Sequence, residues 1–170
     1  KAAPLPRLEL SSVPDEGRTV CAVSAPITGP GCGRELAARL EEYHLCSRGA
    51  GKNLVFALLA DLPESDEREP EGARAWLAET SAAIAELNRR YGGGFVLLTR
   101  PRVKREGKHM GWERKRGALV ELARAVSGRS SSILCREGEM QEIMHSRFIL
   151  ALDSDTQLTP GSAMALIGAM

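Results

Sequence analysis

Two aspartates one residue apart, Asp153 and Asp155, directly follow an apolar run in the segment "ILALDSDTQL", residues 149–158. In an extended backbone, side chains at i and i+2 point to the same side, so the two carboxylates converge if strand geometry continues through Ser154. Carboxylate oxygens so placed suit Mg²⁺ or Mn²⁺, which complete their coordination with waters and substrate phosphates. The sequence therefore predicts a divalent metal site at Asp153 and Asp155. A turn with solvated acids is the alternative, and the residues alone leave both open.

Polar residues also end two other apolar runs. Asp61 closes "NLVFALLAD", and Arg100 follows "FVLLT". Because ligands bind beyond the carboxyl ends of strands in open parallel sheets, we expect both residues at the same rim as the aspartate pair. Asp61 is then a candidate for hydrogen bonding to a base or ribose, with a helix cap or loop acid as the alternative. For Arg100 the alternative to substrate binding is a solvated strand end.

A third polar cluster lies at the start of a predicted helix. The segment "GWERKRGAL" places Arg114, Lys115 and Arg116 in its first turns. The positive end of the helix dipole already favours anions, so cations there lower stability unless a phosphate or carboxylates lie nearby. An anion-binding role and a solvated basic face both remain open. The glycines of "GPGCGR", residues 29–34, do not complete a dinucleotide motif, because Arg34 occupies the position of the third glycine.

These residues need a scaffold, and the hydrophobic pattern predicts an α/β fold. Four short apolar runs, at 19–27, 53–61, 94–101 and 147–152, alternate with helical patterns at 33–45, 73–91 and 111–128. This alternation is typical of a mainly parallel sheet with crossover helices, in three layers. We expect a further helix to begin near residue 159, with Thr159 as its cap and Pro160 at its first position. The segments 62–72, 100–110 and 129–146 are predicted to be loops, the last with at most a turn of helix.

Length and composition narrow the class of protein. The 170 residues fit one domain or part of a larger one. A formal net charge of +1 gives no reason to expect nucleic acid as a partner. No apolar stretch is long enough to span a membrane, and the four cysteines have no zinc-ligand spacing. We interpret residues 1–170 as a single-domain fragment of a longer protein. Residues 1–17 are expected to form an extended leader, and residues 18–170 to form one half of a larger domain.

Three segments resemble a known family. They are "LEEYHL…NLVFALLAD", "HMGWERKRGALVEL" and "RFILALDSDTQLTPGSA", which occur in order between about Arg18 and the last residue. They are similar to the glycosyltransferase portion of cyclic β-1,2-glucan synthases, glycosyltransferase family 84. The resemblance implies a Rossmann-like sheet forming the N-terminal, nucleotide-binding half of a GT-A domain. It also implies an inverting transferase that moves glucose from UDP-glucose to a growing β-1,2-glucan with Mg²⁺ or Mn²⁺.

The resemblance also assigns roles to residues. Asp155 would contact the metal, and Asp153 would lie near the metal or the donor ribose. Pro26, Thr28 and Asp61 would line the uridine, and Lys115 would approach the diphosphate. One departure is that no acid follows the first strand before Glu35, where GT-A enzymes commonly have one.

The remaining parts of such an enzyme are expected outside this sequence. The glucan acceptor site and the general base would follow residue 170, so the fragment alone would be inactive. The fragment itself is expected to be soluble. The parent protein would lie at the cytoplasmic side of the bacterial inner membrane, and only the parent would contact the membrane. Two other functions stay open: a nucleotidyltransferase that makes sugar nucleotides, and a non-catalytic module that binds nucleotide sugars or protein partners.

Overall fold

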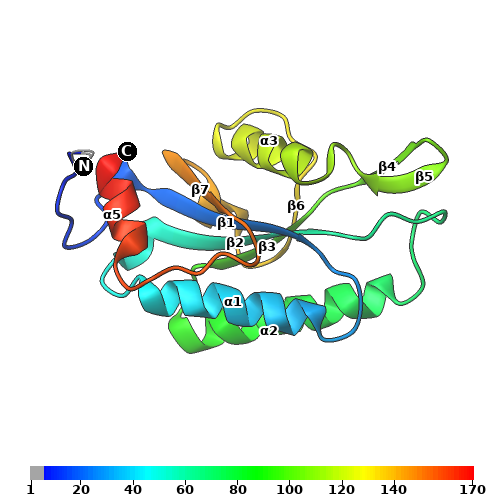
Figure 1. Ribbon diagram of the computed structural model, residues 1–170, viewed down its shortest axis with the longest axis horizontal. Helices are drawn as coiled ribbons and strands as arrows, with labels where there is room; N and C mark the ends of the chain where they lie inside the picture. The colour runs from blue at the N-terminus through cyan, green and yellow to red at the C-terminus, as the bar shows by residue number, and fades with distance from the viewer. Residues whose placement is uncertain (1–5) are drawn as a thin grey trace, which may run out of the picture.

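The computed structural model describes residues 6–170 and shows a three-layer α/β arrangement (Figure 1). In this part of the chain the main sheet has five strands in the order β6-β3-β2-β1-β7. Their bounds are β1 Thr19–Pro26, β2 Leu54–Asp61, β3 Phe95–Thr99, β6 Leu134–Glu137 and β7 Phe148–Leu152. Helices α1 (Cys32–Cys46) and α2 (Ala73–Tyr91) cover one face, and α3 (Arg114–Val126) covers the other. The short helix α4 (Met140–Ile143) contributes to the core on the α3 side.

The sheet is mainly parallel, as predicted. β1 pairs in parallel with β2 and β7, and β2 pairs in parallel with β3. Only β6 runs antiparallel to its neighbour β3 within this sheet. The carboxyl ends of β1, β2, β3 and β7 therefore meet at one edge, where the polar residues of the sequence motifs were expected.

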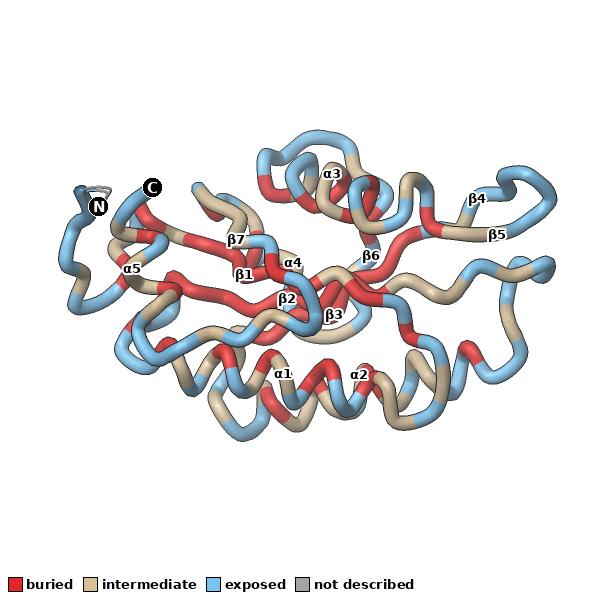
Figure 2. Tube along the Cα trace, viewed as in Figure 1, coloured by how far each residue is buried: buried red, intermediate tan, exposed pale blue. Residues whose placement is uncertain are grey.

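Alternating strand residues divide the core between the two helical layers. Cys21 and Val23 of β1 belong to the cluster that includes Leu40 of α1, whereas Val20 and Ala22 belong to the cluster that includes α3. Figure 2 shows the central strands coloured as buried along most of their length, and successive residues of a strand face opposite sides of the sheet. Burial on both faces explains why these strands are continuous apolar runs rather than alternating patterns. Apolar residues at helical spacing in α1, α2 and α3 pack against the sheet. Those that are buried are Leu36, Leu40, Tyr43, Ile84, Leu87, Leu122 and Val126, and Trp76 and Leu119 are partly buried.

The prediction of loops is wrong for two segments. Segment 100–110 contains most of a hairpin of β4 (Arg102–Arg105) and β5 (Lys108–Gly111), joined by Glu106 and Gly107. Both loop residues have positive φ, 51° and 84°, the conformation of a two-residue I′ hairpin turn. Segment 129–146 contains β6 as well as α4. Both missed strand regions are short and at least partly solvent-facing, so neither produces an apolar run.

The start of the last helix also differs from the prediction. Helix α5 spans Ser162–Ala169 and begins after Gly161, whose φ is 79°. Thr159 does not cap it through its side chain; its carbonyl accepts hydrogen bonds from the backbone N–H and hydroxyl of Ser162.

The predicted leader is described only from residue 6. Residues 1–5 of it lie outside the described part. From residue 6 to 17 the chain forms a 3-10 turn at Asp15–Gly17 and buries Val13. No helix between residues 6 and 170 has both the length and the apolar character needed to cross a bilayer.

Candidate functional site

A cavity of about 460 Å³ opens at the edge where β1 and β2 end. Its lining includes four residues predicted to bind substrate: Pro26, Thr28, Asp61 and Lys115. They come from β1, the connection after β1, the end of β2 and the start of α3. The other lining residues are Ser24, Ala25, Leu62, Pro63, Glu64, Met110, Gly111 and Arg114. Parallel strand ends and the start of α3 thus bring residues far apart in sequence into one concave site.

Arg100, which was also predicted to bind substrate, instead supports the Asp61 wall of this cavity. Its Nε lies 2.9 Å from Oδ1 of Asp61, and its Nη2 lies 2.6 Å from Oδ2. This is a bidentate pair, and the Arg100 side chain is only 4% exposed. Arg100 does not line the 460 Å³ cavity. Its direct partner is therefore the Asp61 carboxylate, which does.

Arg100 also fixes the start of α3. Its guanidinium donates hydrogen bonds to the carbonyl oxygens of Trp112 and Arg114. Between these two residues the backbone enters the left-handed region, with φ of 52° at Glu113 and 46° at Arg114. Such angles are unfavourable for non-glycine residues and persist where surrounding contacts impose them. The Arg100 contacts hold this turn, which sets the position of Lys115.

The first turn of α3 has no acidic residue and carries three cations. Carboxylates from other elements partly balance them. Lys115 forms an ion pair with Asp153, and Arg114 pairs with Glu64 at 2.7 Å. The side chains of Lys115 and Asp153 are 43% and 63% exposed. Lys115 therefore links the cavity to the aspartate motif after β7.

The aspartate motif forms a turn rather than an extended segment. β7 ends at Leu152, and the N–H of Thr156 donates to the carbonyl of Asp153 at 3.0 Å. The condition for convergence by strand alternation, an extended backbone through Ser154, is therefore not met, because the chain turns towards α5 here. Both aspartates are exposed at the rim of the sheet. Convergence of the two carboxylates does not follow from strand alternation, and it depends on side-chain rotation within the turn.

Buried Tyr43 of α1 holds this turn from below. Its hydroxyl donates to the carbonyl of Thr156 at 2.6 Å and lies 3.4 Å from that of Asp153. Burial raises the pKa of Tyr43, so the hydroxyl stays protonated and available as a donor. The helical spacing of Leu36, Leu40 and Tyr43 indicates that Tyr43 faces the core, but it cannot show which loop the hydroxyl reaches.

The aspartate turn offers two carboxylates without a third acidic, His or Cys ligand beside them in the described residues. Within residues 6–170, Asp155 has no side-chain hydrogen bond or ion pair, and the only ion-pair partner of Asp153 is Lys115. In the same range no three His, Cys, Asp or Glu residues are grouped closely enough to hold a metal. Two exposed carboxylates could thus offer oxygens to Mg²⁺ or Mn²⁺, with the other ligands coming from water or substrate.

The hairpin contributes residues that sequence reasoning missed. Met110 and Gly111 of β5 line the cavity. A Cβ on Gly111 would lie 2.6 Å from Nη2 of Arg100 and 2.7 Å from Oδ2 of Asp61, so only glycine lets this strand pass over the pair. The available signal was the Glu106–Gly107 step, because a two-residue turn ending in glycine is typical of hairpins.

Comparison with known proteins relates the chain to a glucan synthase. No known family profile matches the chain. The chain is 34% identical over 167 residues to the cyclic beta-(1,2)-glucan synthase NdvB of Rhizobium meliloti (strain 1021). The aligned region covers 94% of this chain but only 6% of that protein. The chain is thus similar to one small segment of a glucan synthase.

Proposed function

We propose that this chain is the nucleotide-sugar-binding half of an inverting GT-A glycosyltransferase that takes UDP-glucose. The observation that carries the proposal is the convergence of Pro26, Thr28, Asp61 and Lys115 on one cavity at the carboxyl edge of the sheet. The similarity to a cyclic beta-(1,2)-glucan synthase supports glucose transfer to a growing β-1,2-glucan. In this proposal, other parts of a longer protein bind the glucan acceptor and deprotonate its hydroxyl. The longer protein would lie at the cytoplasmic face of a bacterial inner membrane.

The cavity wall supplies groups suited to a nucleoside. Asp61 already accepts two hydrogen bonds from Arg100, but each carboxylate oxygen has a second lone pair. Those lone pairs can accept a base N–H or a ribose hydroxyl. Pro26 and Thr28 would contact the uridine beside Asp61. Because Arg100 fixes the carboxylate in place, little side-chain freedom would be lost on binding.

The rim supplies groups suited to a diphosphate. Lys115 lines the cavity and pairs with Asp153, so a modest rotation would present its ammonium to an incoming diphosphate. Asp155 and Asp153 would hold Mg²⁺ or Mn²⁺. When bound there, a divalent ion neutralises charge on the departing diphosphate. Lys115 adds a fixed positive charge to the same leaving group.

Calorimetric titration tests the proposal. UDP injected into the chain with MnCl₂ should give saturable heat that is lost with a chelator. Asp155→Asn should weaken binding by at least about tenfold, because it removes one charged contact. A tenfold change in affinity corresponds to about 1.4 kcal/mol. Glu16→Gln, which removes an exposed acid from the leader, is the matched control and should bind like wild type. Absence of heat with wild type, or equal affinity in Asp155→Asn, would overturn the proposal.

The nucleotidyltransferase alternative would use the glycine-containing connection after β1 to bind a nucleoside triphosphate. In this connection the N–H of Gly31 donates to Glu79 at 2.8 Å, and Arg34 pairs with Glu79 at 2.9 Å. These contacts tie the connection to α2, so the geometry favours the transferase. The melting temperature with and without UDP and Mn²⁺ distinguishes a nucleotide-binding chain from a purely structural module. Only the nucleotide-binding chain should be stabilised by these ligands.

A further inference from the structure

A second cavity, of about 520 Å³, lies at the opposite edge of the sheet, where β2 and β3 begin. Two connections form most of its wall. One is the segment 47–52 between α1 and β2, and the other is the three-glycine segment 92–94 between α2 and β3. None of its residues belongs to the proposed nucleotide site.

The lining of this cavity carries excess positive charge. Arg18, Arg48 and Lys52 line it together with a single carboxylate, Glu142. Within residues 6–170 none of these three cations has a carboxylate partner within ion-pair distance, and the Nη2 of Arg18 donates only to the backbone carbonyl of Glu142. Unbalanced cations around a concave wall concentrate anions there.

Buried polar groups in the same cavity lack partners. Ser47 is only 4% exposed, and its hydroxyl has no hydrogen-bond partner in the described chain. The Nε of Arg18 and the Oε2 of Glu142 are also buried without partners. Most buried polar atoms in proteins are satisfied, so three unpartnered atoms on residues that line one cavity point to an ordered water, or to a ligand that they reach by a small side-chain rotation. Two can donate, whereas the carboxylate oxygen accepts.

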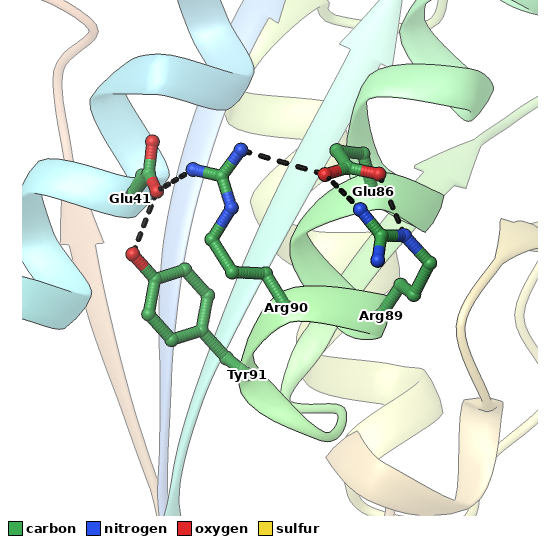
Figure 3. Close-up of polar contacts among 5 residues, drawn as sticks. All are labelled: Glu41, Glu86, Arg89, Arg90 and Tyr91. Carbon is green, nitrogen blue, oxygen red and sulfur yellow. Dashed lines mark hydrogen bonds and ion pairs between the residues drawn. The ribbon is translucent and has the colours of Figure 1, made fainter.

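A further part of the cavity wall is aromatic and is held in place by contacts between α1 and α2. The ring of Tyr91 lies 4.5 Å from that of His44, centroid to centroid. The Tyr91 hydroxyl donates to Glu41 of α1 at 2.7 Å, and Arg90 donates to the same carboxylate at 2.6 Å (Figure 3). These contacts join the end of α2 to α1 immediately before the glycines. Burial lowers the pKa of His44 and so favours the neutral form of this ring.

The glycine segment brings backbone close to the one acid. Gly93 has a φ of 110°, and a Cβ built on it would lie 3.0 Å from Oε1 of Glu142. The N–H of Gly94 donates to that same oxygen at 3.0 Å. The carboxylate is therefore fixed by one oxygen, and its second oxygen remains the unpartnered acceptor.

We propose that this cavity binds a small phosphate monoester that also carries hydroxyl groups, such as a sugar phosphate. The phosphate would take hydrogen bonds and charge from Arg18, Arg48, Lys52 and Ser47, and a ligand hydroxyl would donate to Glu142. The dianion balances the net charge of the lining, and its oxygens match the orphaned donors. Tyr91 and His44 contribute aromatic surface to the lining for the body of the ligand. The site is independent of the proposed function, because it shares no residue with the nucleotide cavity.

Titration of the chain with glucose 6-phosphate, without UDP or Mn²⁺, tests the site. Saturable binding is expected, with weaker binding of inorganic phosphate, which lacks the hydroxyls. The double substitution Arg48→Gln/Lys52→Gln should reduce affinity by at least about tenfold, and Ser47→Ala by several-fold. Arg74→Gln removes an exposed arginine paired with Glu69 and should leave affinity unchanged. Melting without ligand verifies that each variant is folded.

Vesicles distinguish the source of the phosphate. If wild type sediments with phosphatidic acid vesicles, whose lipid phosphate is a monoester, but not with phosphatidylcholine vesicles, glucose 6-phosphate should compete and the double variant should not sediment. That result would assign the same site to a lipid phosphate. The proposal is overturned if neither glucose 6-phosphate nor inorganic phosphate binds. It is also overturned if the double variant binds these two ligands as well as Arg74→Gln does.

Discussion

The guanidinium of Arg100 and the carboxylate of Asp61 form a bidentate pair between the ends of β3 and β2. The two nitrogen-to-oxygen distances are 2.9 and 2.6 Å, and the side chains are 4% and 17% exposed. Arg100 also bonds the carbonyls on either side of the left-handed turn that begins α3. One side chain therefore positions both the Asp61 wall of the cavity and the helix that carries Lys115.

The first prediction concerns removal of this arginine. Arg100→Ala leaves a largely buried carboxylate and two carbonyls without their donor, so the free energy of unfolding should fall by about 3–5 kcal/mol. Arg100→Lys should recover only part of the loss, because an ammonium cannot form the planar fork. Urea denaturation measures both. Arg74→Ala removes an exposed arginine whose side chain is 87% accessible, and it should change stability by less than about 1 kcal/mol. Equal effects of Arg100→Ala and Arg74→Ala would contradict the supporting role.

The second prediction concerns close packing beneath the start of α3. A Cβ on Gly117 would lie 1.8 Å from the carbonyl oxygen of Trp112 and 2.7 Å from Nη1 of Arg100. Helix propensity alone favours alanine by about 1 kcal/mol, but the clash requires the turn to move. Gly117→Ala should therefore destabilise the chain by about 1–3 kcal/mol, the usual effect of overpacking.

Its control is Gly29→Ala, where an added Cβ meets no atom within 4 Å. Thermal melts should show Gly29→Ala close to wild type and Gly117→Ala clearly lower. A stabilised Gly117→Ala would mean that propensity outweighs the contact.

Much of the sheet could be predicted from sequence because its central strands are buried on both faces. Continuous apolar runs identified β1, β2 and β3, and the bounds of α2 matched the predicted 73–91. Parallel pairing then placed Pro26 and Asp61 at one edge, which their register confirms by pairing them directly. These features follow from local hydrophobicity and from a topological rule, so no long-range contact had to be known.

The missed features depend on contacts between distant residues. Arg100 and Asp61 are 39 residues apart, and nothing in either local segment predicts that they pair. The hairpin of β4 and β5 is rich in charge and largely exposed, so its strands have no apolar signature. The turn at Asp153 follows from the chain leaving the sheet after Leu152. Apolar periodicity indicates that β7 exists but not how the backbone continues beyond it.

The third prediction is a pH dependence from Glu121 of α3. Its carboxylate accepts hydrogen bonds from the N–H and hydroxyl of Ser132, from Ser131 and from Arg124. The backbone N–H of Ser132 contributes most, and together these donors lower the pKa of Glu121 from 4.5 to about 2. A pKa that is lower in the folded state adds stability above the unfolded value, and this stability is lost as the pH falls towards the folded value.

Glu121→Gln should therefore cost about 2–3 kcal/mol of unfolding free energy at pH 7 and progressively less from pH 5 to pH 2. Urea titrations at several pH values measure the difference from wild type. Ser132→Ala keeps the backbone N–H and should cause a smaller loss. A Glu121→Gln difference that stays constant with pH would show that the lost contacts act without a change in protonation.

The last prediction separates positioning of the aspartate turn from general stability. Tyr43→Phe removes the hydroxyl that donates to Thr156 at 2.6 Å, in the turn that carries Asp153 and Asp155. Its stability loss should be about 1 kcal/mol, that of one hydrogen bond. If the proposed function holds, affinity for UDP with Mn²⁺ should also fall several-fold, because the freed turn presents its carboxylates less often in a binding geometry.

Tyr91→Phe is the matched control: it removes a hydroxyl bonded to Glu41 near the opposite edge of the sheet, so it should lower stability without changing UDP affinity. Calorimetry and thermal melts on both variants measure the two effects separately. Equal loss of UDP affinity in both variants would show that the hydroxyl of Tyr43 acts only through overall stability, and unchanged affinity in Tyr43→Phe would show that the turn is held without it.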